Sequence, residues 1–201
     1  MKPSYRFFRG CYHLAHTVIS VFYRIRVTGK ENIPAGGAMV CANHSSMVDP
    51  FLLAFTFGIG CHLHVIAKVE LFKIPVISQV LRKMGMISVN RGISDVATIK
   101  STFGYLKKNE KVAIFPEGTR TVKEGSISAK SGAIKLADHA GVPLVPVFLP
   151  RKKPLFSRIH IVIGEPYHIE RQGKKPTADE YALLADTLME KIRMLNPEVC
   201  S

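Results

Sequence analysis

The chain has 201 residues, of which 47% are hydrophobic and 21% are charged. This length and composition exclude a disordered chain and fit one domain with a substantial core. The formal net charge of +13 indicates an anionic partner, and the sequence contains no nucleic-acid-binding motif, which leaves an anionic membrane surface or a phosphorylated small molecule.

The N-terminal stretch combines positive charge with an apolar middle. Residues 1–30 contain no acidic residue, and the apolar segment 11–23 lies between Arg9 and Arg24. This segment is shorter than the roughly 20 apolar residues that span a bilayer. We predict that residues 1–26 form an amphipathic, membrane-associating helix at the interface, followed by one main domain over residues 27–201. An amphipathic helix packed on the core would give the same pattern.

Short apolar runs bounded by Gly, Pro or polar residues predict strands at residues 26–29, 38–42, 61–67, 86–89, 112–115, 144–148 and 159–163. Helical spacing and capping residues predict helices at 51–59, within 71–83, after Ser94, at 131–140, and after a capping box of Thr177 and Glu180. In the helix after Ser94 the apolar positions at helical spacing are Val96, Ile99, Phe103 and Leu106. Because strands and helices alternate, we expect an α/β fold: a single domain with a mixed, largely parallel sheet flanked by helices.

His44 and Asp49 follow the buried strand predicted at residues 38–42. Pro50 suits the first position of a helix and Asp49 suits its N-cap, which places both residues on a tight connecting turn. There the carboxylate can fold back onto the imidazole and leave its other nitrogen free to take a proton. The alternative is that Asp49 only caps the helix and His44 is only a polar strand end.

Other polar residues follow other predicted strands. Glu117, Gly118, Thr119 and Arg120 come after the strand at 112–115. Since loops at the carboxyl ends of parallel strands gather in one crevice, we expect this segment near His44. Gly118 would let backbone amides approach an anion, and Arg120 offers a planar fork of donors for phosphate. Glu117 would bind substrate hydroxyls or hold Arg120. Further cations that could add charge there are Lys68, Arg91 and Lys130.

His62 and His64 alternate onto one face of a predicted strand and could form part of a metal site. No third ligand is evident nearby in the sequence, so we interpret them as structural and predict no metal. The cysteines are far apart and show no spacing typical of zinc or disulfides, which indicates a reducing, cytosolic setting; they are Cys11, Cys41, Cys61 and Cys200.

Several of these segments together resemble, in the same order, the conserved blocks of the glycerolipid acyltransferase family. The resemblance covers roughly residues 27–168, and ordered blocks are more specific than any single motif. The blocks are His44–Asp49, Lys68–Leu71, Gly85–Arg91, Phe115–Arg120 and Val142–Val147.

The resemblance implies that residues 27–201 form an acyltransferase domain in which His44 is the general base and Asp49 its orienter. It implies that a fatty acyl group passes from acyl-carrier protein or acyl-coenzyme A to the sn-2 hydroxyl of 1-acylglycerol 3-phosphate, with no cofactor. The expected product is phosphatidic acid, and the oxyanion would be stabilised by backbone amides. It also implies that the blocks Gly85–Arg91 and Phe115–Arg120 bind the substrate phosphate, at positions matched by Arg91, Glu117, Gly118 and Arg120.

Two other functions stay open on the sequence. The acceptor could be glycerol 3-phosphate or a lyso aminolipid, or the protein could be a non-catalytic binder of acidic phospholipids. Many family members have longer hydrophobic N-terminal regions, so the short leader here predicts a peripheral or monotopic protein on the cytoplasmic face of the cell membrane. Although Ser45 and Ser46 adjoin His44, no G-x-S-x-G elbow is present, and we predict no protein nucleophile.

Overall fold

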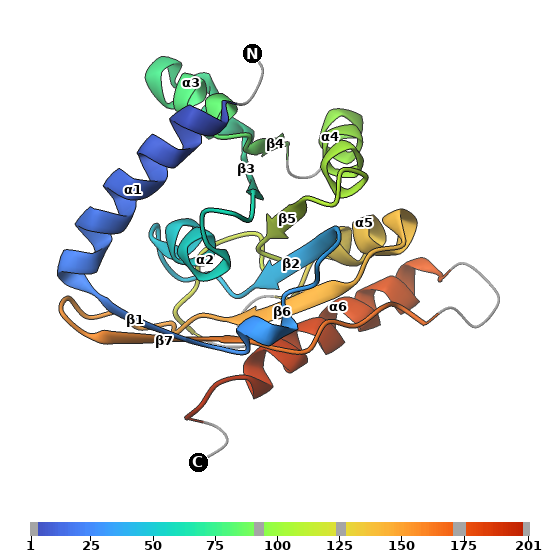
Figure 1. Ribbon diagram of the computed structural model, residues 1–201. Coiled ribbons are helices and arrows are strands. Elements are labelled where there is room, and N and C mark those ends of the chain that lie inside the picture. Colours follow the sequence, from blue (N-terminus) through green and yellow to red (C-terminus); the bar gives the residue numbers. More distant parts are fainter. Residues whose placement is uncertain (1–3, 91–94, 124–127, 171–175, 199–201) are drawn as a thin grey trace.

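A computed structural model describes residues 4–90, 95–123, 128–170 and 176–198 of the chain. One sheet of seven strands forms its centre, with helices on both faces (Figure 1). The strands are β1 (Arg24–Thr28), β2 (Ala38–Ala42), β3 (Leu63–Lys68), β4 (Ile87–Val89), β5 (Lys111–Ile114), β6 (Leu144–Phe148) and β7 (Arg158–Ile163).

The strands lie in the order β1-β7-β6-β2-β5-β3-β4. The five strands from β6 to β4 are mutually parallel, because each is reached by a crossover connection. Strand β7 runs antiparallel to β6 and pairs in parallel with β1 at the edge. The prediction of a single α/β domain with a mixed, largely parallel sheet is therefore confirmed.

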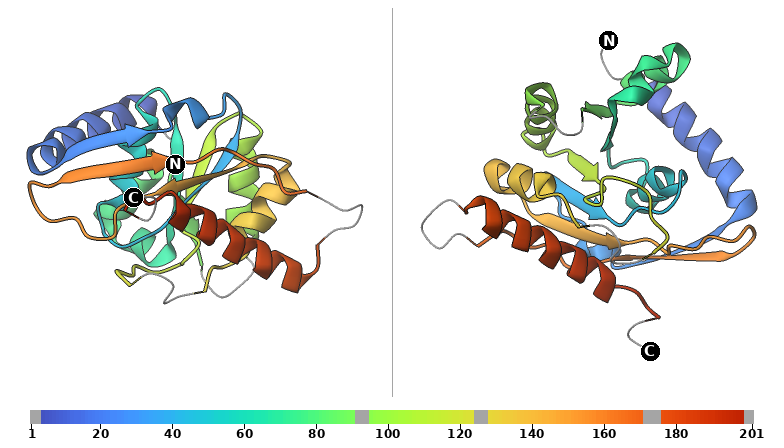
Figure 2. Two further views of the ribbon diagram at one scale, coloured as in Figure 1. Left: turned by 90° about the horizontal axis from the view of Figure 1, so that it is seen from below. Right: turned by 180° about the vertical axis from the view of Figure 1, so that it is seen from behind.

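Helices cover the sheet in two layers, with α1 and α2 on one face and α4, α5 and α6 on the other (Figures 1 and 2). Two short 3-10 helices and α3 complete the connections. The helices are α1 (Tyr5–Phe22), α2 (Asp49–Phe57), α3 (Pro75–Lys83), α4 (Val96–Leu106), α5 (Gly132–Ala140) and α6 (Ala178–Met194), with 3-10 turns at Lys30–Asn32 and Val69–Lys73.

The central strand β2 is buried along its whole length. Val40 packs into the cluster beneath α2, whereas Met39 and Cys41 pack into the cluster beneath α5 and α6. A strand covered on both faces needs apolar residues at every position, which explains its uninterrupted apolar sequence. Burying this strand fixes where it ends, and His44 lies two residues beyond that end.

The capping residues predicted for α6 and α4 can be compared with the caps in the structure. Thr177 and Glu180 form the predicted capping box of α6. Helix α4 is capped by Asp95, whose side chain accepts from the Thr98 amide at 3.1 Å, and the predicted cap, Ser94, lies outside the described residues. Val96, the first residue of α4, is exposed, whereas Leu106 at the other end of the helix is buried.

Helix α1 lies along α2, and the rings of Tyr12 and His16 meet the edge of Phe55 at centroid distances of 5.2 and 5.0 Å. It buries Phe8 and Ile19 but leaves other apolar side chains exposed. Within the described part of the chain, no helix combines the length and hydropathy needed to span a membrane. The expected N-terminal helix is present, and the predicted division at residues 26 and 27 falls inside β1.

Candidate functional site

Polar side chains gather where four adjacent parallel strands end. His44 follows β2, Glu117 follows β5 and Lys68 ends β3, while Arg151 and Lys153 follow β6. Because these strands are neighbours and run in one direction, their carboxyl ends form one edge of the sheet. The sequence prediction of a common polar edge is confirmed for β2 and β5, whose loops are in direct contact.

The predicted contact between His44 and Asp49 is present. Nδ1 of His44 lies 2.9 Å from Oδ2 of Asp49, and the same oxygen accepts from the backbone amides of Ser45 at 2.7 Å and Ser46 at 2.8 Å. Asp49 is the first residue of α2, with Val48 at the N-cap. The prediction that Asp49 caps this helix is therefore wrong, because its carboxylate turns back to the loop before the helix.

A lysine balances the charge of Asp49. Nζ of Lys153 lies 2.8 Å from Oδ1 of Asp49, and the side chains are 3% and 0% exposed. Lys153 also donates to the Ser45 hydroxyl at 2.8 Å and to the carbonyl of Pro150. Burial alone would raise the pKa of Asp49, but the hydrogen bond from His44 and the charge of Lys153 outweigh it, so the pKa lies below its ordinary value. Asp49 is therefore a buried anion.

An ionised carboxylate can only accept hydrogen bonds, so the contact with Asp49 places the proton of a neutral His44 on Nδ1. Its Nε2 then carries a free lone pair. The ring stacks on Phe115, with centroids 4.1 Å apart and planes inclined by 21°, and the side chain stays 15% exposed. The site thus presents an oriented base to the surface.

Glu117 ties the loop after β5 to His44. Its Oε2 accepts from the His44 amide at 2.6 Å, and its Oε1 pairs with Arg151 at 2.6 Å. Arg151 also donates to the Thr121 carbonyl at 2.9 Å, and the Thr121 amide donates to the His44 carbonyl at 2.8 Å. Both carboxylate oxygens of Glu117 thus serve the protein, which favours a holding role, with Arg151 rather than Arg120 as the ion-pair partner.

The structure brings Gly118 and Lys130 together. Gly118 has a φ of 68°, and a Cβ at this position would lie 3.1 Å from Cε of Lys130, so a larger residue would displace the lysine. The Gly118 amide donates to the Phe115 carbonyl at 3.0 Å and is therefore used within the turn. Thr119, Arg120 and the Lys130 head are exposed beside it.

The remaining predicted cations are Lys68 and Arg91. Lys68 is exposed at the end of β3, separated from β2 by β5. Arg91 lies outside the described residues.

Sequence reasoning missed two buried cations, Arg151 and Lys153. Both lie in the connection after β6. The side chain of Asn43, just after β2, holds the start of this connection: it donates to the Leu149 carbonyl at 2.7 Å and accepts from the Leu149 amide at 2.8 Å. The only signal in the sequence is the basic run from Arg151 to Lys153 just after a predicted strand. Such a run is usually solvated, so nothing indicated that two of its members are buried.

The model of the family described as Acyltransferase matches residues 24–149. The chain belongs to this acyltransferase family. It is 31% identical over 197 residues to the 1-acyl-sn-glycerol-3-phosphate acyltransferase of Bacillus subtilis, covering 94% of this chain and 96% of that protein. It is 33% identical over 155 residues to the protein of the same name from Borreliella burgdorferi, covering 74% of this chain and 59% of that protein.

A solved structure supports the fold of this acyltransferase. The 1-acyl-sn-glycerophosphate (LPA) acyltransferase of Thermotoga maritima superposes with a TM-score of 0.71 at 23% identity, over 96% of this chain and 80% of that one. Within the acyltransferase, the matched segment includes His44, Asp49 and Glu117 but ends just before Arg151 and Lys153. The counter-ions of both acidic residues therefore come from outside the family segment.

Proposed function

We propose that this acyltransferase moves a fatty acyl group from a thioester of acyl-carrier protein or coenzyme A to the sn-2 hydroxyl of 1-acylglycerol 3-phosphate, giving phosphatidic acid. The observation that carries the proposal is the oriented base, His44, held by a buried carboxylate at the common edge of the sheet. Similarity to a 1-acyl-sn-glycerol-3-phosphate acyltransferase over 94% of the chain supports the choice of substrate.

In the proposed reaction, Nε2 of His44 takes the proton of the sn-2 hydroxyl while that oxygen attacks the thioester carbonyl. The resulting imidazolium is stabilised by Asp49, whose negative charge is 2.9 Å away. The tetrahedral intermediate collapses with cleavage of the carbon–sulfur bond, and the departing thiolate takes the proton from Nε2. Base and acid are thus the same nitrogen, and the enzyme returns to its starting state.

The two serines beside His44 serve the loop rather than the chemistry. The Ser45 hydroxyl accepts from Lys153 at 2.8 Å, and the Ser46 hydroxyl accepts from the Val48 amide at 3.4 Å. Neither arrangement activates a nucleophile, which supports direct attack by the acceptor hydroxyl. The amides of Ser45 and Ser46 are committed to Asp49, so other donors must stabilise the oxyanion.

The phosphate of the acceptor would bind beside the loop after β5. Arg120 and Lys130 place two exposed cations next to Gly118, close to the segment that contacts His44. A guanidinium can bond two phosphate oxygens at once. Thr119 offers a further hydroxyl donor, and Lys68 at the end of β3 would extend the positive field along the same edge. Arg91 is kept as a phosphate-binding residue on the family resemblance alone.

The enzyme would reach its lipid acceptor by docking through α1. Its exposed apolar side chains Leu14, Val18 and Val21 recur at helical spacing. Leu155 and Phe156 are exposed near the C-terminal end of the helix. There the Phe156 amide donates to the Phe22 carbonyl, and the two rings are in contact. Basic residues suit anionic headgroups around such an apolar face, and α1 itself exposes Arg6 and Arg9.

Substituting His44→Ala should reduce acyl transfer to 1-acylglycerol 3-phosphate by about 100- to 10,000-fold, because the general base is removed. Initial rates with acyl-carrier-protein and coenzyme A thioesters measure this. His168→Ala, at an exposed histidine, is the control and should keep the parent rate. A His44→Ala rate within a few-fold of the parent would refute the base, and a parent protein that prefers glycerol 3-phosphate or a lyso aminolipid would refute the acceptor.

Replacing Arg120→Ala should lower kcat/KM for 1-acylglycerol 3-phosphate by about 10- to 100-fold, the effect of losing a charge-assisted hydrogen bond. Monoacylglycerol has no phosphate, so its rate as an acceptor should be the same in this variant as in the parent protein. Arg193→Ala, on the exposed side of α6, controls for loss of a surface arginine. Equal losses with both acceptors would remove Arg120 from the phosphate site.

Vesicle sedimentation tests whether the protein binds membranes through the exposed apolar side chains of α1. Leu14→Glu should weaken binding to phosphatidylglycerol vesicles at least several-fold, since it places a charge where α1 would enter the headgroup layer. Leu183→Glu on α6 is a matched control, because these leucines are 70% and 69% exposed. Similar binding by the two variants would contradict docking through α1.

A further inference from the structure

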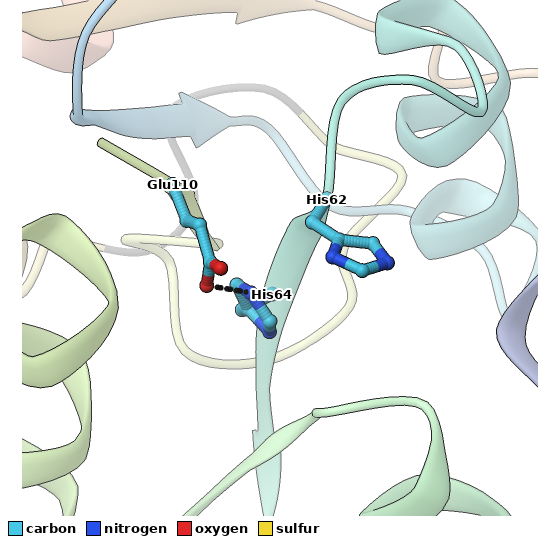
Figure 3. A group of neighbouring side chains, drawn as sticks. All are labelled: His62, His64 and Glu110. Carbon is cyan, nitrogen blue, oxygen red and sulfur yellow. Dashed lines mark hydrogen bonds and ion pairs between the residues drawn. The ribbon is translucent and has the colours of Figure 1, made fainter. Parts of the chain in front are cut away.

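Three metal-ligating side chains meet at the opposite edge of the sheet from His44. His62 precedes β3, His64 lies within β3 and Glu110 directly precedes the neighbouring strand β5 (Figure 3). Leu63 pairs with Lys111 across these parallel strands, so the three residues occupy adjacent positions at the amino ends. Glu110 is the third ligand that was not evident near the histidines in the sequence.

The candidate ligand atoms of His62, His64 and Glu110 all lie within 4.8 Å of one another. Imidazole nitrogens and a carboxylate oxygen are the donors that zinc takes in sites with two histidines and one glutamate. Ligands about 2.1 Å from a tetrahedral ion lie roughly 3.4 Å apart. The cluster therefore needs only a small side-chain rotation, and His62 is half-buried at the start of its strand, where such a rotation is possible.

His64 is already oriented as a ligand. Its Nδ1 lies 2.8 Å from the Gly85 carbonyl, and its ring stacks on Tyr105 with centroids 3.6 Å apart. A carbonyl only accepts, so Nδ1 carries a proton and Nε2 points to Glu110. A histidine that donates its second ring N–H to a backbone carbonyl is the usual arrangement around a protein-bound metal.

The ring of His64 and the carboxylate of Glu110 face each other directly. Nε2 lies 2.8 Å from Oε2 of Glu110, so an imidazole protonated only on Nδ1 would turn a lone pair toward a carboxylate oxygen. A Zn²⁺ ion bound to both atoms would take this lone pair and hold the carboxylate oxygen, which needs nitrogen and oxygen to separate from 2.8 Å to roughly 3.4 Å.

We propose that His62, His64 and Glu110 bind one Zn²⁺ ion, with water completing its coordination. This ion lies at the amino ends of β3 and β5, so it has a structural role and takes no part in the chemistry at His44. The ring of His62 also meets the rings of Tyr5 and Phe8 at centroid distances of 4.7 and 4.9 Å. Binding would therefore join the first turns of α1 to the sheet.

Calorimetric titration with ZnCl₂ tests this on the full chain after dialysis against EDTA. We expect one equivalent of Zn²⁺ to bind, and melting to shift upward when zinc is present. His62→Ala and Glu110→Gln should each weaken binding at least tenfold and abolish the shift. Both variants should fold, because neither side chain is fully buried, and their circular dichroism verifies this.

His168→Ala is the control, since it removes an exposed histidine elsewhere and should leave zinc binding unchanged. Failure of the parent protein to bind Zn²⁺ would overturn the proposal and leave His64 and Glu110 as an ion pair. Binding with the same affinity in folded His62→Ala and Glu110→Gln would also overturn it, because the ion would then lie elsewhere. Acyl transfer by the parent is measured separately and does not enter this test.

Discussion

The negative charge of Asp49 is the interaction on which the rest of the site depends. A carboxylate with no exposed surface costs several kcal/mol unless charge and hydrogen bonds compensate it. Here two backbone amides, the His44 ring and Lys153 surround its two oxygens. Satisfying the anion fixes the path of the loop after β2, and that path in turn fixes the orientation of His44.

A second buried ion pair extends this arrangement across the sheet edge. Glu117, from the loop after β5, pairs with Arg151 and holds the His44 amide. Arg151 and Lys153 both come from the connection after β6, so one short segment supplies the cations for two acidic loops. Three loops from adjacent strands are thereby tied together, and removing either cation would leave a buried carboxylate without its counter-ion. Arg120, the proposed phosphate ligand, is exposed beside this fixed centre.

The sequence predicted best what depends on local patterns. The uninterrupted apolar strands at 38–42 and 144–148 have the expected bounds, and the spacing of His44 and Asp49 predicted their contact. The N-cap prediction for Asp49 was wrong. A residue before Pro50 suits an N-cap, but the helix begins one residue earlier and the carboxylate binds the preceding loop, because burial beside Lys153 outweighs the capping preference.

What the sequence could not predict are contacts between distant segments. Lys153 lies 108 residues from Ser45, which it bonds, and Glu110 lies 46 residues from His64. These pairs follow from the order of strands in the sheet, which places β6 beside β2 and β5 beside β3. Local periodicity predicts that strands exist, but the order in which they pair is set by packing across the whole domain.

The central claim is that Asp49 holds His44 with its proton on Nδ1 and leaves Nε2 as the base. Nitrogen NMR of the histidine side chains tests it most directly, with the His44 signals assigned by their loss in His44→Ala. The account predicts that the neutral ring carries its proton on Nδ1 and that Nε2 is unprotonated. A neutral His44 with its proton on Nε2 would contradict the account.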